Sequence, residues 1–565
     1  MTDHPWLATY PKHVAWDQKF TAKPLYCLVD DTAAEFPDNI AYDFMGRELS
    51  YRDLLDQVNR MAKGLQGLGV GKGTHIGIFM PNCPQFAVAY FAILKAGGTV
   101  VNYSPLYAEH ELIAQVEDSE TDIMITLDLA ALYPTIQAVT EKSRLKHLVV
   151  DQFANALPFP KNILFKLFQG SKIAKIVRDE YHVDFRRLMQ NDGRVAAVDI
   201  DVTDDVAVIQ YTGGTTGVPK GAMLTHANIY INVLQLEKWA IDIDRGKEVV
   251  PGFLPFFHVF SMTVVMDLSI FIGAKVVILP KFELDAAITL MKKYRPTLFA
   301  GVPTMFTALL KHGSARNVGM DHVKMCMSGG APLPVELGQS FKKEMDIAIS
   351  EGYGLTETSP VCASNPYDRE TRNGSIGLPL PATEIIIIDR EDPAKPMPLG
   401  ESGEICIHGP QVMKGYWKRE DATKETIING LLHTGDVGYM DEEGFTYIID
   451  RDKDLILVGG FNVYPRVVEE AIYQHPAVHE VTVIGVPDDY LGERPKAFVT
   501  LKDAADPLTE EDLMAFIKGK LGKHERPKAI EFRAELPKTM IGKLSKKELV
   551  AEEMAKYEKA KKAGK

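Results

Sequence analysis

The stretch Tyr211-Thr-Gly-Gly-Thr-Thr-Gly-Val-Pro-Lys-Gly221 is the most informative part of the chain. Its glycines allow the backbone to approach a ligand closely and leave N–H groups free to point inward. Its threonines add hydroxyl donors, and Lys220 adds a positive charge. The stretch therefore predicts a cradle for phosphate groups, with a flexible surface loop as the alternative on composition alone. It is not a Walker A loop, because Val218 and Pro219 separate Gly217 from Lys220.

The segments on either side of this loop predict an alternating α/β chain. We expect a strand over residues 206–211 before the loop and a helix over residues 225–239 after it. Further helices are predicted over residues 50–68 and 285–294, and further strands over residues 75–80 and 275–279. This alternation is typical of mainly parallel sheets that are covered by helices.

The length of the chain, 565 residues, is too great for one hydrophobic core. Short strands predicted over residues 383–389, 403–407 and 444–450 indicate a small β-rich unit. The charge cluster that begins at Arg451 then leads into a compact run of helices and strands with a lysine-rich end. We therefore predict a large N-terminal α/β domain with a β-rich subdomain over residues 1–450, and a small α+β domain over residues 451–565.

The composition, with 46% apolar and 25% charged residues, is that of a globular protein. A net charge of −13 argues against a nucleic-acid partner, because nucleic-acid binding needs basic patches. Five scattered cysteines are typical of reduced thiols in the cytoplasm. The N-terminus lacks the pattern of a signal peptide. Asp267 and Lys275 interrupt the longest apolar stretch, so we expect a buried helix and a strand there, not a membrane span.

Residues 154–177 form an unusual segment in which large apolar residues are mixed with lysines at positions 161, 166, 172 and 175. A basic amphipathic stretch of this kind can lie on a membrane surface. Two interpretations stay open, a contact with a membrane and a surface helix that packs on its own domain.

Three further clusters carry groups suited to a nucleotide. In the cluster over residues 351–359, Tyr353 can stack on a purine, Thr356 can donate to a phosphate oxygen, and Glu357 is a hard oxygen ligand suited to Mg²⁺. In the cluster over residues 433–438, Asp436 can bind a ribose diol. The loop over residues 537–543 ends in a glycine and Lys543. Taken singly, each cluster is also compatible with an ordinary turn or a solvated side chain.

These clusters, in this order, resemble the superfamily of adenylate-forming enzymes, which includes acyl-CoA synthetases, peptide-synthetase adenylation domains and beetle luciferases. The resemblance extends to Ser328-Gly-Gly-Ala-Pro-Leu333, Asp450-Arg-Asp-Lys453 and Gly459-Gly-Phe-Asn-Val-Tyr-Pro465, and it spans nearly the whole chain. Within the superfamily, the chain is most similar to bacterial long-chain fatty acid–CoA ligases.

The resemblance implies a two-step reaction. A carboxylate first reacts with ATP to give acyl-AMP and pyrophosphate, and the acyl group then passes to the thiol of coenzyme A. The resemblance also implies that the C-terminal domain is mobile and rotates around a hinge at Lys453. The rotation would move Lys543 out of the site and bring the loop Gly459-Gly460 in to line a pantetheine tunnel.

The resemblance also assigns roles to residues. Lys543, Thr356, Glu357 and Lys220 are the predicted catalytic residues, with Glu357 and Thr212 as the predicted Mg²⁺ ligands. The chemistry needs positioning and neutralisation of charge on the phosphate, but no nucleophilic side chain. The predicted ATP- and AMP-binding residues are Thr212, Gly213, Gly214, Thr215, Thr216, Gly217, Lys220, Gly330, Ala331, Glu351, Gly352, Tyr353, Gly354, Thr356, Asp436, Arg451 and Lys543.

The acyl site is predicted from Leu254-Pro-Phe-Phe-His-Val-Phe260, which resembles the family segment that lines it. The predicted acyl-binding residues are His258, Gly301 and Gly329. No charged residue stands in residues 256–262 or 300–305, and an unpaired buried charge is unfavourable, so an apolar acyl chain fits better than an amino acid. For His258, a core histidine satisfied by the backbone is the alternative. Which residue gates the acyl site is left undecided, because Met262 stands where one long-chain relative carries a tryptophan.

The predicted function is the ATP- and Mg²⁺-dependent activation of a long-chain fatty acid and its transfer to coenzyme A. The alternatives are a ligase for medium-chain or aryl acids, a fatty acyl-AMP ligase that loads a carrier protein, and a non-catalytic nucleotide- or lipid-binding relative. The predicted partners are small molecules, without nucleic acid. The predicted location is the cytoplasm, with contact at the inner face of the cell membrane and a homodimer as open alternatives.

Overall fold

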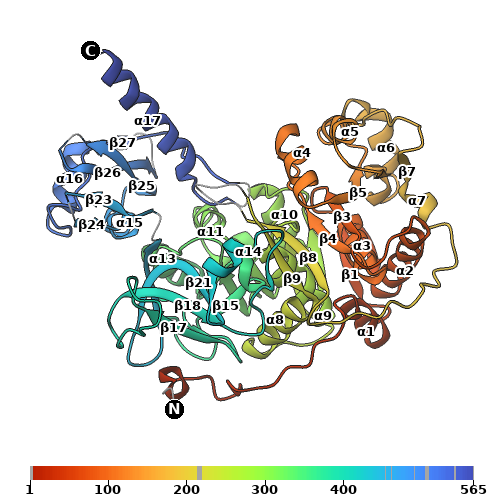
Figure 1. Ribbon diagram of the computed structural model, residues 1–565, viewed down its shortest axis with the longest axis horizontal. Helices are drawn as coiled ribbons and strands as arrows, with labels where there is room; N and C mark the ends of the chain where they lie inside the picture. The colour runs from red at the N-terminus through yellow and green to blue at the C-terminus, as the bar shows by residue number, and fades with distance from the viewer. Residues whose placement is uncertain are drawn as a thin grey trace.

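The computed structural model describes residues 4–212, 219–451, 454–459, 461–488, 490–502, 508–539 and 542–563. A large N-terminal part carries most of the sheets, and a smaller C-terminal part lies beside it with helix α17 leading away (Figure 1). Among the described helices, none has the length and apolar character needed to cross a membrane. The predicted α/β class with a smaller α+β part at the C-terminus is confirmed.

The first sheet contains the strand that leads into the glycine- and threonine-rich stretch. Its neighbouring strands are parallel from β8 to β7, whereas β8 and β9 form an antiparallel pair on either side of that stretch. Every residue of β3 is buried, as expected for a parallel strand covered on both faces. In spatial order, the strands are β19 (Gly415–Tyr416), β9 (Gly221–Thr225), β8 (Val206–Tyr211), β4 (Thr99–Asn102), β3 (His75–Phe79), β5 (Thr121–Leu127), β6 (His147–Asp151) and β7 (His182–Asp184).

Two more sheets complete the α/β region, and one of them leads directly to the nucleotide clusters. Strands β12, β13 and β14 are parallel neighbours, so their carboxyl ends meet at one edge. That sheet consists of β12 (Leu298–Gly301), β13 (Met325–Ser328), β14 (Ser350–Gly354), β15 (Val361–Ser364) and β16 (Leu378–Pro379). The other sheet consists of β10 (Val249–Gly252), β11 (Lys275–Ile278), β1 (Ile40–Phe44) and β2 (Arg47–Ser50).

Helices cover these sheets, and two long helices begin at capping residues. Ser50 accepts a hydrogen bond from the Asp53 N–H and caps α2, and Thr225 caps α8 through the Asn228 N–H. The α-helices of the N-terminal part are α1 (Cys27–Glu35), α2 (Tyr51–Gly67), α3 (Pro84–Lys95), α4 (Glu109–Asp118), α5 (Tyr133–Lys142), α6 (Lys161–Phe168), α7 (Phe185–Leu188), α8 (His226–Trp239), α9 (Leu268–Phe271), α10 (Leu284–Tyr294), α11 (Pro303–Leu310), α12 (Ala315–Val318), α13 (Val335–Met345) and α14 (Glu420–Thr426).

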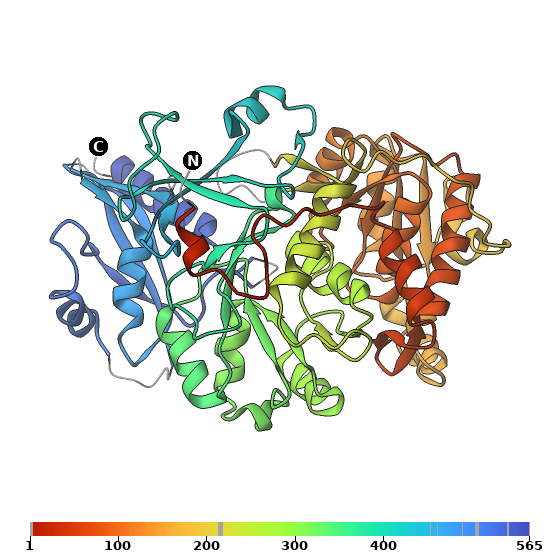
Figure 2. The same cartoon turned by 90° about the horizontal axis from the view of Figure 1, so that it is seen from below.

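The predicted β-rich unit is a separate antiparallel sheet. Its strands are β17 (Glu384–Ile388), β18 (Gly403–His408), β21 (Leu431–Met440), β20 (Ile427–Ile428) and β22 (Thr446–Arg451), the last of which pairs with β21. The N-terminal stretch of the chain runs back along the large part to this unit (Figure 2). There the Trp16 indole N–H donates to the Thr383 carbonyl at 2.8 Å, so the chain's beginning is fastened beside β17.

The C-terminal part forms its own sheet and its own buried apolar clusters, around Val483 and around Phe498. The predicted boundary near residue 450 stays a prediction, since β22 continues to Arg451 and residues 452–453 lie outside the described residues. The elements of this part are β23 (Ile456–Val458), β24 (Phe461–Val463), α15 (Pro465–Tyr473), β25 (Val478–Asp488), β26 (Gly492–Leu501), α16 (Glu510–Ile517), β27 (Ile530–Phe532) and α17 (Lys546–Ala563).

Candidate active site

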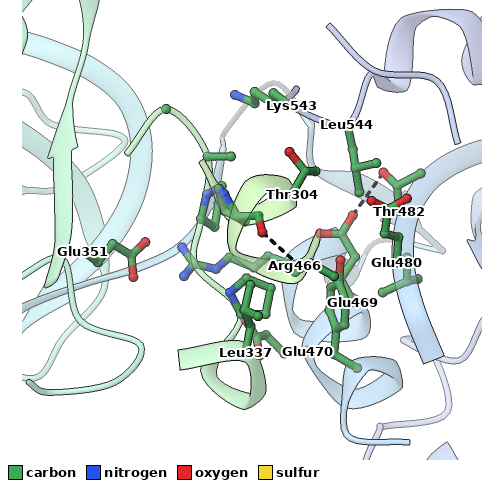
Figure 3. A pocket seen from close by; sticks show the side chains of 18 of the residues that line it. Thr304, Leu337, Glu351, Arg466, Glu469, Glu470, Glu480, Thr482, Lys543 and Leu544 are labelled. Atoms are coloured by element: carbon green, nitrogen blue, oxygen red, sulfur yellow. Dashed lines mark hydrogen bonds between the residues drawn. The ribbon is translucent and has the colours of Figure 1, made fainter. Parts of the chain in front are cut away.

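A cleft of about 1760 Å³, measured to include its solvent-open mouth, lies where the C-terminal part meets the large part. Residues of both parts line it, and Lys543 and Arg466 enter from the C-terminal side (Figure 3). The predicted site residues that line this cleft are Gly330, Ala331, Glu351, Gly352, Tyr353, Gly354, Asp436, Arg451 and Lys543.

The carboxylate of Asp436 is the most tightly held polar group in the cleft. It is buried, and it lies opposite Arg451 in the pairing of β21 with β22. The Arg451 Nε–H donates to one carboxylate oxygen at 3.0 Å, and the Tyr353 hydroxyl donates to the other at 2.5 Å. Asp436, with Tyr353 as well, raises the pKa of Arg451 above its usual range. The structure therefore brings together three residues that were predicted separately from three sequence clusters.

The backbone around this carboxylate is fixed by a polar cluster under the loop. Glu404 accepts from the Gly435 N–H at 2.9 Å and lies 2.7 Å from His433 Nδ1, and Cys406 Sγ lies 3.4 Å from the same nitrogen. These three side chains are close enough to be tested as metal ligands. The 2.7 Å distance between Glu404 and His433 Nδ1 is that of a hydrogen bond. The cluster is therefore explained by its support of the Thr434–Asp436 loop.

Lys543 reaches the cleft from the loop that precedes α17. The Gly542 carbonyl accepts a 3.0 Å hydrogen bond from the Thr304 hydroxyl, which fastens this loop to α11 of the large part. Burial, with the neighbouring Arg451, lowers the pKa of Lys543 to about 8. The lysine that the sequence predicted as catalytic therefore stands beside the Asp436–Arg451 pair, with its charge in a poorly solvated place.

Glu357 lies next to this group and is held by a tyrosine. It belongs to a short 3₁₀ turn, Thr356–Thr358, that follows the end of β14. The Tyr416 hydroxyl donates to Glu357 Oε1 at 2.6 Å, and the Lys220 ammonium lies 4.8 Å from the centre of the Tyr416 ring. The Thr212 N–H donates to the Lys220 carbonyl at 2.9 Å at the base of the loop. Thr212, Lys220, Thr356 and Glu357 are thus neighbours of the cleft and not part of its lining.

Several predicted residues lie outside the described residues, so nothing in the structure tests them. They are Gly213, Gly214, Thr215, Thr216 and Gly217 of the phosphate loop, Lys453 of the hinge and Gly460 of the coenzyme A loop. Gly459 is described and exposed, and its N–H donates to the Leu491 carbonyl at 2.8 Å. It does not line the cleft.

Arg466 and Lys546 are two residues of the cleft that the sequence did not reveal. Arg466 is buried at the start of α15, and its guanidinium extends toward Glu351 (Figure 3). Its backbone N–H donates to Asp450 Oδ2 at 2.7 Å. Burial raises the pKa of Glu351 to about 7 even though Arg466 opposes the shift, and burial raises the pKa of Asp450 to about 6. An arginine on an amphipathic helix is normally exposed to solvent, so only the packing of α15 beside the cleft reveals the role of Arg466.

Lys546 lies at the first position of α17, three residues after Lys543. It is 3.5 Å from Glu469 and 3.6 Å from Asp454. Burial alone would lower the pKa of Lys546, but Glu469, Asp450 and Asp454 together raise it. This ion-pair network holds the start of α17 on the C-terminal part and so sets the position of the loop that carries Lys543.

The predicted acyl residues lie beside aromatic rings. A Cβ at Gly329 would lie 2.8 Å from the Phe260 ring, and a Cβ at Gly301 would lie 2.9 Å from the Phe299 ring. The small residues therefore create room for phenylalanine rings in this conformation. His258 Nδ1 accepts from the Phe260 N–H at 3.3 Å, and burial together with Lys543 lowers the pKa of His258 to about 4, so its ring is neutral at neutral pH.

A second, mostly apolar cavity lies beside the Phe299 ring. It is lined by residues of α8, β12, β13 and a π-helix over Ser261–Asp267 that directly follows the predicted acyl segment. π-Helical turns occur frequently at functional sites. Trp239, which the sequence did not connect with the acyl group, lines this cavity together with Val264, Ala300 and Met327. Strands β12 and β13 lead from this cavity to the main cleft, because Gly330 and Thr304 follow their ends.

Comparison with known families identifies the class of protein. The AMP-binding enzyme model matches residues 29–417, and the AMP-binding enzyme C-terminal domain model matches residues 467–543. The first match alone covers more than half of the 565 residues. The chain therefore belongs to the AMP-binding enzyme family, as the resemblance of its motifs predicted.

Individual relatives agree over nearly the full length. The chain is 43% identical over 560 residues to a long-chain-fatty-acid–CoA ligase of Bacillus subtilis strain 168, covering 97% of this chain and 98% of the relative. It is 39% identical to a protein of the same name from Escherichia coli O6:H1, covering 98% and 99%. Among solved structures, ATP-bound MatB from Rhodopseudomonas palustris matches with a TM-score of 0.82 at 30% identity, covering 94% and 99%.

Proposed function

We propose that this protein activates a long-chain fatty acid with ATP to give acyl-AMP and pyrophosphate, and then transfers the acyl group to coenzyme A. The observation that carries the proposal is the meeting of Asp436, Arg451 and Lys543 in one cleft between two parts of the chain. A carboxylate and an arginine suited to a ribose lie there beside a lysine suited to a phosphate, on a chain of the AMP-binding enzyme family.

In the first step, a carboxylate oxygen of the acid attacks the α-phosphorus of ATP. The new bond joins acyl oxygen to phosphorus, and the bond to the bridging oxygen breaks, so pyrophosphate leaves with the electron pair. Lys543 holds the attacking carboxylate and the phosphate oxygens together and neutralises their charge, which is the main task of such a site. Asp436 accepts from the ribose hydroxyls, while Gly330, Ala331 and Tyr353 flank the adenine.

The residues near Glu357 fit a magnesium ion. Mg²⁺ prefers one or two protein oxygens together with phosphate oxygens and water. Glu357 offers a carboxylate, Thr356 offers a hydroxyl beside it in the chain, and Thr212 offers a hydroxyl from the base of the loop over residues 211–221. Tyr416 holds the Glu357 side chain in one orientation. When bound, the ion supplies positive charge to the phosphates of ATP. Lys220, over the ring of Tyr416, adds a second positive charge on the same side.

In the second step, the thiolate sulfur of coenzyme A attacks the acyl carbon and AMP leaves. We propose that the small domain, residues 451–565, rotates about Lys453 between the two steps and brings the Gly459-Gly460 loop toward the cleft. The exposure of Leu457 and Phe461, at 53% and 60%, supports this proposal, because the loop carries apolar residues that its present position leaves in solvent.

For the acid, we propose a long acyl chain. The mostly apolar cavity beside Phe299 supports this choice, since lining residues such as Val264 and Met327 offer no partner for a charged group. The names of the relatives from Bacillus subtilis and Escherichia coli point to the same class of acid. Medium-chain and aryl acids are the competing substrates, and a carrier protein is the competing acceptor.

The test is pyrophosphate release with ATP, Mg²⁺ and a series of acids from butyrate to stearate, followed by acyl-CoA formation when coenzyme A is added. We expect release to increase with chain length up to palmitate and to require Mg²⁺. No release with any acid would contradict the enzyme proposal and favour a non-catalytic relative. Release without thioester formation would favour the carrier-protein acceptor.

We also propose a cytoplasmic location, which the five free cysteines support because reduced thiols are typical there. Formation of a homodimer stays a prediction, and sedimentation velocity of the purified protein tests it directly.

A further inference from the structure

Helix α6 (Lys161–Phe168) carries the densest group of exposed apolar side chains on the described chain. None of its residues is buried. Phe168 is 75% exposed and Leu167 is 69% exposed, and Phe159, just before the helix, is 79% exposed. Ile163 and Leu164 add further exposed surface. An apolar patch of this kind on an otherwise polar surface marks an interaction site more often than chance exposure.

The helix is nevertheless anchored to the body of the protein. The Phe165 ring packs against the buried Phe153 ring at a centroid distance of 5.2 Å. The Lys161 ammonium donates to the Met45 carbonyl at 2.9 Å, and the Lys166 ammonium donates to the Gln152 side chain at 2.8 Å. One side of α6 is therefore fixed, and the other apolar residues are held outward.

The chain segment that contains the helix is basic, although Asp151 directly precedes it and Asp179 and Glu180 directly follow it. Between Gln152 and Arg178 the chain holds four lysines and one arginine, and no aspartate or glutamate. In the ion pairs of the described residues, none of these five basic residues pairs with a carboxylate. The whole chain carries a net charge of −13, so the charge of this segment is opposite in sign to that of the protein as a whole.

We propose that α6, with Phe159 before it, is a docking surface for a bilayer of anionic phospholipid. The apolar side chains would enter the boundary between headgroups and acyl chains, and the exposed basic residues that follow the helix, Lys172, Lys175 and Arg178, would stay at the level of the phosphates. A lipid surface fits better than a protein partner, because the exposed basic residues that follow the apolar helix complement a layer of anionic headgroups. Helix α6 also lies at the end of the large part away from the C-terminal part (Figure 1). Short helices with aromatic and leucine residues on one face and lysines around them are suited to the plane of a membrane interface.

This inference rests on the proposed ligase function only for the reason why the protein would bind a bilayer. Long-chain fatty acids partition into bilayers, so an enzyme that docks on a bilayer meets its substrate there. Helix α6 and the C-terminal part lie at opposite ends of the molecule (Figure 1). Docking therefore leaves the C-terminal part on the side that faces solvent.

The test is flotation of the purified full chain with phosphatidylcholine vesicles that contain or lack phosphatidylglycerol. We expect binding to the anionic vesicles that weakens as salt is added, since lysine attraction to anionic lipid is screened. The double variant Leu167→Gln/Phe168→Gln should bind at least about tenfold more weakly, because two large apolar side chains no longer enter the lipid. The matched control is Leu399→Gln, which changes an exposed leucine outside the patch and should bind as the unchanged protein does.

Equal binding by the double variant and the unchanged protein would overturn the proposal. A second result would also overturn it: neither protein binds vesicles, and only the unchanged protein self-associates in sedimentation. That result would mean that a second copy of the chain covers α6. Pyrophosphate release with palmitate carried on albumin separates this failure from failure of the ligase proposal. We expect the double variant to keep that activity and to lose activity with palmitate supplied in anionic vesicles. Thermal unfolding confirms that both variants are folded.

Discussion

At the scale of single residues, the proposed mechanism makes Lys543 the group on which the first step depends most. Lys543→Ala should slow adenylation by about 10²–10³-fold, the effect of losing one donor that stabilises developing charge. Thioester formation from supplied acyl-AMP should stay nearly unchanged, because the lysine acts before the acyl-AMP exists. Single-turnover pyrophosphate release and acyl-CoA formation measure the two steps separately. Equal losses in both steps would contradict this division of work.

The same lysine predicts a pH dependence. Its pKa is lowered to about 8, so the ammonium form dominates below that pH and is lost as the pH rises through it. Adenylation in the free enzyme should therefore decline on the alkaline side, while thioester formation from supplied acyl-AMP should not follow the same profile. Lys543→Arg keeps its charge at every accessible pH, so its alkaline decline should vanish even where its maximal rate is lower. A decline that persists unchanged in this variant would assign it to another group.

Tyr416 gives a prediction about the metal. Tyr416→Phe removes the hydroxyl that donates to Glu357 at 2.6 Å but keeps the ring beneath Lys220. The loss of one hydrogen bond, about 1 kcal/mol, should raise the Mg²⁺ concentration for half-maximal adenylation by roughly fivefold. Tyr439→Phe, whose ring stacks on Tyr447 away from Glu357, is the control and should leave the Mg²⁺ requirement unchanged. A change in ATP affinity alone, with the Mg²⁺ requirement constant, would contradict the role.

The residues that the sequence predicted and those that it missed differ in kind. Asp436 and Lys543 stand in short clusters whose chemistry is readable, and both line the cleft. Arg466 and Tyr416 stand in segments with no such signal, since an arginine on an amphipathic helix and a tyrosine near a turn are common on surfaces. Their importance comes from contacts with residues far away in the chain, and such contacts follow only from the packed fold.

At the scale of elements, the site is built where parallel strands end. Strands β12, β13 and β14 point their carboxyl ends at the cleft, which is the usual place for ligands in such sheets. The sequence predicted the strand before the phosphate loop and the helix after it, because apolar runs and capping residues are local signals. The π-helix over Ser261–Asp267 and the cavity behind it were not predictable, because they depend on how α8 packs on β12.

One contact joins an element of the large part to the loop before α17. The Thr304 hydroxyl, on α11, donates to the Gly542 carbonyl at 3.0 Å. Thr304→Val keeps the volume and removes this hydrogen bond, so adenylation should slow by roughly fivefold while thioester formation stays unchanged. The control is Thr289→Val on α10, whose hydroxyl bonds only within its own helix to the Asp285 carbonyl. Equal slowing in both variants would mean that helix stability, and not the contact, is responsible.

At the scale of the whole molecule, the proposed rotation of the small domain gives a sharp test. Proline fixes φ near −65°, so Lys453→Pro should stop the rotation if that residue is the hinge. Acyl-AMP should then form and remain bound, while acyl-CoA should not appear. The control is Lys453→Ala, which should turn over normally. A proline in place of Lys502 would not serve as a control, because the Lys502 N–H donates to the Ala477 carbonyl. Normal overall turnover by Lys453→Pro would exclude this hinge.

The division into a large and a small part was predictable from the charge cluster after Asp450 and the compact run of predicted helices and strands that follows it. The cleft between them was not, because it arises from a docking pose in which Lys543 faces Asp436 and Arg451. A pose of this kind depends on a few polar contacts between the parts, and no local pattern in the chain encodes it.

The double engagement of Asp436 bears on which nucleotide sugars are accepted. A carboxylate offers about four lone-pair positions, and the Tyr353 hydroxyl and Arg451 guanidinium occupy two of them without any ligand. A 2′-deoxyribose would therefore leave no buried oxygen without a donor. A site discriminates strongly against a missing substrate hydroxyl when the loss leaves a buried polar group of the protein without a hydrogen-bond partner. The Asp436 carboxylate would keep its two protein donors. The enzyme should accept 2′-deoxy-ATP with only a modest loss of rate, because its own tyrosine and arginine already stabilise the carboxylate.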